Sequence, residues 1–309
     1  MLKYVIKRIL SLIPVILGTT LIVFLILNVA KGDPARMILG QEATEQQVEE
    51  LREELGLNDP VLVQYGRYMI NLLRGDMGIS YKTGTSVAAE IGARFPYTLV
   101  LAFVAISVSM LLAVPLGVIA AVKQNSIFDG VSMVISLIGV SMPGFWMGLL
   151  LIIQFSLKLG WFPSFGADEW KSIVLPAVTI AFLSMASIAR TMRSSMLEVI
   201  RQDYIRTARA KGLSEWQVIR RHALRNAMIP TVTAVGLQFG IQMGGSVLTE
   251  TVFSWPGIGR LMITSINSRD IPTVLGCIIV FAICFAIVNL LVDLLYGFID
   301  PRMKAQYSS

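Results

Sequence analysis

Long apolar stretches alternate with polar segments along this chain of 309 residues. Because about 20 apolar residues are needed to cross a bilayer as a helix, each long stretch predicts one transmembrane helix. The predicted spans lie near residues 9–30, 97–122, 131–157, 173–189, 228–249 and 273–299. Pro115, Pro143 and Pro176 lie in or beside these spans, where proline bends or interrupts a helix. The pattern therefore predicts an all-α integral membrane protein with six transmembrane helices.

The overall composition supports this class. Hydrophobic residues make up 55% of the chain and charged residues 15%, with a mean hydropathy of +0.69. Such a chain is too apolar for a water-soluble globule. The net charge of +6 does not indicate nucleic acid, because the basic residues gather at the ends of apolar segments. We therefore expect a lipid bilayer around the chain and no nucleic-acid partner.

The distribution of basic residues predicts the orientation. Residues 190–227 contain nine Lys and Arg residues against three acidic ones, which places this loop in the cytoplasm. Alternation from there places 31–94 outside and both termini in the cytoplasm, including the tail with Arg302 and Lys304. We divide the chain into 1–96, an N-terminal transmembrane helix plus an extracytoplasmic loop, and 97–309, a five-helix core with a cytoplasmic loop at about 190–228.

The predicted outer loop carries a cluster of acidic residues after Thr44. Thr44 is a suitable helix cap, and Val48, Leu51 and Leu55 recur at helical spacing. These features predict a short amphipathic helix. Its acidic side is either a solvated face or a docking surface for an extracytoplasmic partner.

The fifth predicted span combines small and polar residues. Glycines four residues apart allow close helix packing, whereas buried glutamines need partners or a wet cavity. The residues concerned are Gly236, Gly240, Gly244 and Gly245 with Gln238 and Gln242. Packing explains the glycines more readily, and the glutamines favour a helix that lines a path. Gln238, Gln242 and Gly244 are therefore our candidates for a translocation path.

The chain lacks the common patterns of catalytic chemistry. It contains no GxxxxGK[ST] phosphate loop, GxSxG elbow or HExxH pair, and its one histidine is His222. Cys277 and Cys284 lie on one helix face, about two turns apart, too far to bridge. Asp293 is a conspicuous acid in the last span, and we favour a structural role over a proton relay. We predict no catalytic residue and no metal site, so any ATP must be hydrolysed by another chain.

The basic loop contains the segment IRTARAKGLSEWQVIRRHALRNAMIP at 205–230. An Ala-rich stretch, a break at Gly212 and a second helical stretch capped by Ser214 predict a helix, turn and helix. An ordered polar element of this kind in a membrane protein favours a docking surface for another protein.

This segment resembles the EAA loop of importer-type ABC permeases, whose pattern is roughly E-A-A-x3-G-x9-I-x-L-P. Gly212, Ala208 and Leu224 match its glycine, second alanine and leucine, whereas other positions depart from it: Arg206, Thr207, His222 and Arg225. DYIRTARAKGL and HALRNAMIP are similar to the variant in the dipeptide, oligopeptide and nickel branch. MLKYVIKRIL, GDPAR, LGLNDP, GDMGIS, RTMRSSMLEV, ETVFSWPGIGR and NLLVDLLYGFIDPR extend the resemblance over essentially the whole chain. LGWFPSFGADEW and GLQFGIQMGGS resemble dipeptide and glutathione permeases.

The resemblance implies a type I ABC importer permease of a bacterial or archaeal cytoplasmic membrane, with dipeptides, oligopeptides or glutathione as substrate. Its implied partners are a homologous second permease subunit, two ATPase subunits that hold ATP and Mg²⁺, and an extracytoplasmic substrate-binding protein. No cofactor is expected in this chain. The residues expected to couple to the ATPase are Arg206, Thr207, Ala208, Arg209, Ala210, Lys211, Gly212, Leu213 and Leu224.

Three alternatives remain open at this point. The nearest is import of nickel or a metal chelate, because selectivity can reside in the binding protein. The second is a solitary ion-coupled secondary transporter, for which an intramembrane charge pair and inverted repeats are expected. The third is a channel or structural scaffold, for which the basic cytoplasmic segment needs another purpose.

Overall fold

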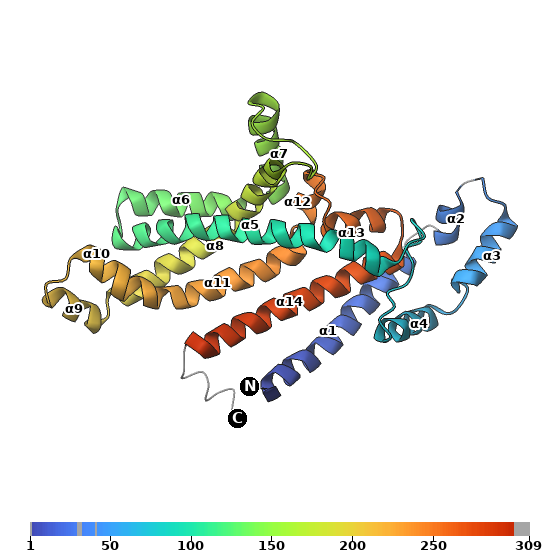
Figure 1. The fold of residues 1–309 in the computed structure, drawn as a ribbon, viewed down its shortest axis with the longest axis horizontal. Helices are drawn as coiled ribbons and strands as arrows, with labels where there is room; N and C mark the ends of the chain where they lie inside the picture. Colours follow the sequence, from blue (N-terminus) through green and yellow to red (C-terminus); the bar gives the residue numbers. More distant parts are fainter. Residues whose placement is uncertain (1, 30–32, 41, 300–309) are drawn as a thin grey trace. The chain divides into compact units, whose positions relative to one another are not determined.

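A computed structural model describes residues 2–29, 33–40 and 42–299. The described part of the chain is built from helices (Figure 1). One isolated antiparallel β-bridge pairs Ile79 with Ser86. The chain divides into two units. We call the described residues of Leu99–Trp255 and Ile287–Ile299 the central unit, and those of Leu2–Thr98 and Pro256–Ala286 the N-terminal unit. The predicted cytoplasmic tail with Arg302 and Lys304 lies outside the described residues.

The helices that begin in the N-terminal unit are α1 (Leu2–Val29), α2 (Pro34–Leu39), α3 (Glu45–Leu55), α4 (Val61–Leu73), α5 (Val87–Val122), α13 (Ile258–Asn267) and α14 (Ile271–Ile299). Those of the central unit are α6 (Ile127–Ser141), α7 (Gly144–Leu151), the π-helix η1 (Ile152–Lys158), the 3₁₀-helix η2 (Trp170–Ile173), α8 (Val174–Ile200), α9 (Asp203–Ala210), α10 (Glu215–Gln217), the π-helix η3 (Val218–Ala223), α11 (Leu224–Gly245) and α12 (Val247–Val252). The central unit also takes the later parts of α5 and α14.

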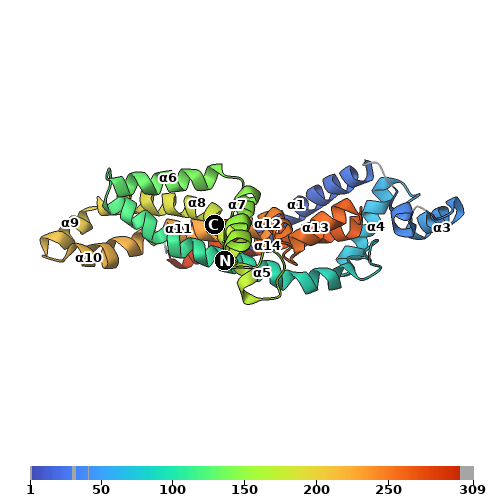
Figure 2. The same cartoon turned by 90° about the horizontal axis from the view of Figure 1, so that it is seen from above.

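Helix α8 is the most buried apolar helix of the central unit, and Figure 2 shows it between α6 and α11. Glycines let its neighbours approach closely. A Cβ atom at Gly117 of α5 would lie 2.7 Å from the Ala189 carbonyl oxygen, and one at Gly139 of α6 would lie 3.1 Å from that of Phe182. Since lipid offers no hydrophobic driving force between helices, such close contact is a main source of their association.

The third predicted span is not one straight helix. Helix α6 ends at Ser141, Pro143 is the N-cap of α7, and the two segments meet at 102° (Figure 1). Proline has no N–H to donate to the preceding turn, and its ring clashes with a helical carbonyl. The predicted span over 131–157 is therefore bent, and the expected interruption at Pro143 is confirmed.

The helices also extend beyond the predicted spans. Helix α5 begins at Val87 rather than near 97, and α8 continues to Ile200 rather than ending near 189. In the extension of α8, Met192 and Met196 are buried four residues apart, so one apolar side sustains the helix among basic residues. The predicted cytoplasmic loop at 190–227 is thus mostly helical.

Apolarity varies among the described helices. Four are long and apolar enough to cross a membrane, and five if the bent pair α6–α7 with η1 counts as one. Helix α11, the fifth predicted span, is not among them, because glycine, threonine and glutamine dilute its apolar residues. It also ends at Gly245, and α12 follows it.

The short amphipathic helix predicted after Thr44 is confirmed in the N-terminal unit. Thr44 and Gln47 form a reciprocal capping box at the start of α3, and Val48 is fully buried. Asp270, at the start of α14, accepts hydrogen bonds from Ser80 Oγ (2.5 Å) and the Tyr81 N–H (3.0 Å). These bonds fix the loop before α5 on α14.

The close approach of α11 and α14 in the central unit generates a packing prediction. A Cβ atom at Gly236 would lie 2.1 Å from Val292 Cγ2, so the Gly236→Ala protein has to separate the helices. We expect a loss of about 1–3 kcal/mol of stability, measured as a lower thermal midpoint in detergent. Adding Val292→Ala should restore much of the loss, because it removes the clashing methyl. Equal losses in the single and double variants would contradict this account.

Candidate functional site

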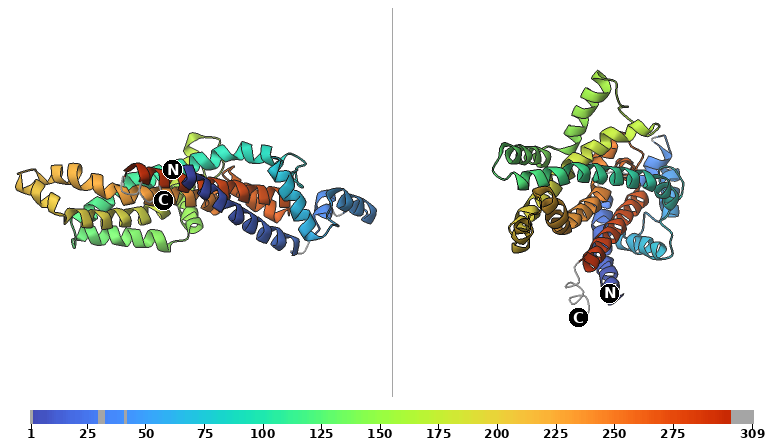
Figure 3. Two further views of the ribbon diagram at one scale, coloured as in Figure 1. Left: turned by 90° about the horizontal axis from the view of Figure 1, so that it is seen from below. Right: turned by 60° about the vertical axis from the view of Figure 1, so that its left-hand side comes forward.

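The predicted coupling segment is held on the central unit by one face of α9. Ile205 and Ala208 are buried three residues apart. They pack in a cluster with residues of α5, α8, η3 and α11: Ala121, Met192, Met196, Val218, Ala223 and Ala227. Figure 3 shows this end of the unit in its left panel, where the chain turns from α9 into α10. The same cluster therefore holds α9 against α8 and the start of α11.

The chain reverses direction after α9 at Gly212, whose φ is +80°. The Gly212 N–H donates to the Arg209 carbonyl (2.9 Å), and the Leu213 N–H donates to the Ala208 carbonyl (3.4 Å). This is a Schellman arrangement, which needs a left-handed residue and an apolar contact across the turn. Leu213 supplies the contact by packing on the cluster around Ala208. The structure therefore confirms the predicted helix break at Gly212.

An ion pair and a capping box close the turn between α9 and α10. Arg209 Nε donates to Glu215 Oε1 at 2.6 Å, and Arg209 Nη2 donates to Glu215 Oε2 at 3.3 Å. The Ser214 N–H donates to Gln217 Oε1 at 3.3 Å in a capping box, which confirms the predicted cap. The hydrogen bond from Arg209 lowers the pKa of Glu215 below its ordinary value, although desolvation opposes the shift. The carboxylate therefore stays charged near neutral pH.

The predicted coupling residues fall into two groups. Ala208 is buried and Leu213 and Leu224 are half-buried, so these three hold the element in place. The exposed ones are Arg206, Thr207, Arg209, Ala210, Lys211 and Gly212. Arg209 is exposed, but its guanidinium forms an ion pair with Glu215. The surface available to a partner is thus small, basic and rigid.

Two aromatic residues of this surface were not predicted. Trp216 is 67% exposed, and the Arg220 guanidinium lies 6.0 Å from its ring centroid. Tyr204 is also exposed, and its hydroxyl accepts a hydrogen bond from Asn226 Nδ2 at 2.9 Å. A large exposed aromatic beside a basic group is typical of protein interfaces. The signal in the sequence was a tryptophan within a polar helix rather than at the edge of a span.

The predicted path residues lie in different surroundings on α11. Gln242 is only 4% exposed, and its Nε2 donates to Ser184 Oγ on α8 at 2.6 Å. Its Oε1 has no hydrogen-bond partner among the described residues. Gln238 is half-buried, whereas Gly244 is exposed and faces open space. A role of these residues in a path stays a prediction.

Besides Asp270, two buried acidic residues escaped the sequence analysis. Asp129 of α6 is paired with Arg193 of α8 through two hydrogen bonds of 2.7 Å. Glu250 is fully buried in α12 and accepts from Ser246 Oγ at 3.0 Å. Both lie at helix ends, where sequence alone does not distinguish a buried acid from a solvated one. Among the described residues, no group of three or more His, Cys, Asp or Glu could hold a metal ion.

Taken together, the apolar helices and the ordered polar hairpin at 203–217 define a helical membrane protein. Residues 113–305 match the model of the binding-protein-dependent transport system inner membrane component family. Residues 1–102 match the model of the N-terminal part of such membrane components. The chain belongs to this family of integral inner membrane transport components.

Its relatives are permeases matched over almost their whole length. The chain is 45% identical over 332 residues to the dipeptide transport system permease protein DppB of Alkalihalophilus pseudofirmus, covering 98% of this chain and 100% of that one. It is also 45% identical over 304 residues to the glutathione transport system permease protein GsiC of Escherichia coli K12. This match covers 98% of this chain and 99% of that one.

Solved structures of ABC transporters share the fold. One is an inward-facing methionine ABC transporter, MetNI, with a TM-score of 0.59 and 19% identity, covering 68% of this chain and 96% of that one. Another is the crystal structure of an amino acid ABC transporter with histidines. Its TM-score is 0.55 and its identity 16%, and the match covers 68% of this chain and 94% of that one. These neighbours show that the chain has the fold of an ABC importer permease.

The bond between Arg209 and Glu215 generates a prediction about the rigidity of the turn. Because both side chains are partly exposed, solvent screening limits the contribution to about 0.2–1 kcal/mol. We expect Glu215→Gln to speed hydrogen exchange of the amides at 212–215 at pH 7. The charge swap Arg209→Glu with Glu215→Arg should restore protection.

The pH dependence follows from the direction of the pKa shift. A lowered folded pKa gives stabilisation that is complete above the ordinary value of 4.5 and lost as the pH falls through the folded pKa. The protection factor of these amides, which is corrected for the intrinsic pH dependence of exchange, should therefore fall only in acid in the native protein, and the Glu215→Gln protein should lack this step. Unchanged exchange in Glu215→Gln at pH 7 would refute the role of the ion pair.

Proposed function

We propose that this chain is a permease subunit of an ATP-driven ABC importer for dipeptides and short oligopeptides, with glutathione within its range. The observation that carries the proposal is full-length similarity to dipeptide and glutathione permeases. The rigid hairpin at 203–217 supports it, since a permease without a phosphate loop needs a site that receives the motion of a separate ATPase.

The proposed topology has six crossings and both termini in the cytoplasm. The crossings are α1, α5, the bent segment α6–α7–η1, α8, η3 with α11, and α14. The long segment between α1 and α5 then lies on the extracytoplasmic side, and α9 and α10 face the cytoplasm. The basic residues beside α9 and α10 favour this orientation.

The proposed assembly contains a homologous second permease, two ATPase subunits and an extracytoplasmic substrate-binding protein. ATP and Mg²⁺ belong to the ATPase subunits, and this chain supplies no cofactor. The exposed part of the hairpin, with Arg206, Lys211 and Trp216, is the surface we assign to the ATPase. Its charge suits an acidic cleft.

The proposed mechanism is alternating access. Closure of the ATPase dimer on ATP displaces α9, and the cluster around Ile205 and Ala208 passes the displacement to α8 and α11. The helices then shift from inward-open to outward-open and accept peptide from the docked binding protein. The energy comes from the different contacts that the ATPase makes with α9 in its two states.

The substrate prediction is tested by the ATPase activity of the assembled transporter. We expect the complex in lipid, with its binding protein, to hydrolyse ATP faster when dipeptides, tripeptides or glutathione are added. Binding protein without ligand is the control. Stimulation by nickel or a chelate alone would move the substrate to metal, and substrate uptake without an associated ATPase would support a solitary transporter.

The coupling prediction uses Gly212. A β-branched residue is strained at a φ of +80°, whereas asparagine tolerates it. We expect Gly212→Val to abolish peptide-stimulated ATP hydrolysis while the chain still inserts and assembles, and Gly212→Asn to retain most activity. A Cβ atom there meets open space within this chain, so the expected local effect is backbone strain rather than a Cβ clash. Normal coupling in the Gly212→Val complex would refute the assignment.

A further inference from the structure

Helix α4 in the N-terminal unit has an inverted amphipathic pattern. A helix on a water-exposed domain buries its apolar side and exposes its polar side. In α4, the strongly exposed residues include Leu62 (68%), Ile70 (54%) and Leu73 (88%), which lie on one side at helical spacing with Gly66. None of the helix's residues is fully buried. Large apolar side chains are therefore turned outward along the whole helix.

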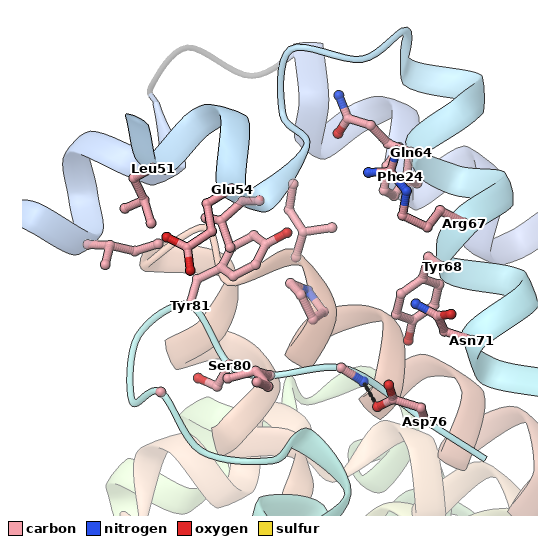
Figure 4. A pocket seen from close by; sticks show the side chains of 17 residues that line it. Phe24, Leu51, Glu54, Gln64, Arg67, Tyr68, Asn71, Asp76, Ser80 and Tyr81 are labelled. Carbon is pink, nitrogen blue, oxygen red and sulfur yellow. Dashed lines mark hydrogen bonds between the residues drawn. The ribbon is translucent and has the colours of Figure 1, made fainter. Parts of the chain in front are cut away.

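The polar residues of α4 are turned the other way, into a cavity. Gln64, Arg67, Tyr68 and Asn71 follow one another at spacings of three and four residues. They line a cavity of about 600 Å³ bounded by α3, α4 and the loop before α5, and Figure 4 shows them on its α4 side. Gln64 Nε2 donates to the Leu57 and Asp59 carbonyls, at 2.9 and 2.8 Å.

The depth of α4 follows from its contacts with α1. The Tyr65 hydroxyl donates to the Leu17 carbonyl at 2.8 Å and lies 2.9 Å from Thr20 Oγ1, and its ring packs on Phe24 with centroids 5.6 Å apart. The apolar part of α1 runs over Leu10–Val29. At 1.5 Å per residue, Leu17 lies about 18 Å from its outer end. That is more than half of a hydrocarbon core of about 30 Å.

The remaining surface of α1 is itself suited to lipid. Only 11% of its apolar window is buried, and Ile22 and Ile26 are exposed on the side of α1 away from the α4 contact. If α1 crosses the bilayer, α4 packs at a level where its outward side meets acyl chains rather than water. Its 13 residues span about 20 Å, too short to cross.

We propose that α4 lies within the hydrocarbon region against α1, with the Leu62, Ile70 and Leu73 side in contact with lipid and its polar side lining the cavity. The backbone polar groups in the interior of α4 are bonded within the helix, as the hydrocarbon region requires, whereas its first turn has no side-chain cap. The segment between α1 and α5 is therefore not a wholly aqueous loop.

The test measures the surroundings of α4 in the assembled transporter in lipid nanodiscs. Single cysteines replace Ile70 and Leu73 in a background of Cys277→Ala and Cys284→Ala with confirmed ATPase activity, and each carries a nitroxide spin label. Two matched reference sites bound the result: Ile26→Cys on α1 for lipid and Glu53→Cys on α3 for water. Power-saturation EPR compares collisions with oxygen, which concentrates in lipid, and with a water-soluble nickel chelate.

We expect both α4 labels to favour oxygen over the nickel chelate, as the label at Ile26 does. Nickel accessibility like that at Glu53 would overturn the proposal, because α4 would then lie in water. Low accessibility to both reagents would also overturn it, since a protein partner would cover the apolar side. If the Ile26 label itself reports water, α1 does not cross the bilayer as assumed, which identifies failure of the proposed topology rather than of the α4 contact.

Discussion

Close backbone contact around α8 is the constraint on which the central unit depends. In lipid, apolar side chains gain little by leaving the solvent for one another, so helices associate through dense packing and polar contacts. Gly117 and Gly139 remove the side chains that would keep α5 and α6 away from α8. Gln242 and the pair of Asp129 and Arg193 add directional bonds to the same helix. Packing and polar contacts thus fix α8 from several sides.

The polar hairpin at 203–217 is packed on this closely packed set of helices. A surface loop with no buried side would absorb a push locally, whereas α9 is anchored through Ile205 and Ala208 to the ends of α8 and α11. Gly212 turns the chain sharply enough for Leu213 to join the same cluster. The buried residues therefore anchor the hairpin, and their exposed neighbours form its surface.

Local features were predicted well where short-range chemistry decides them. The cap at Thr44, the break at Gly212 and the cap at Ser214 depend on residues within a few positions, and the structure confirms each. Helix ends were predicted poorly, because the end of an apolar run is not the end of a helix. Buried methionines continue α8 through a basic segment that hydropathy assigns to a loop.

The sequence by itself determined the helical membrane class, the family and the position of the polar hairpin, because apolar periodicity and turn residues act locally. Only the tertiary structure decided which residues are buried. It placed Glu250 out of water, paired Asp129 with Arg193 across 64 positions, and turned the polar side of α4 inward. These outcomes depend on what packs against each side chain, and neighbours that are distant in sequence leave no periodic signal in a single chain.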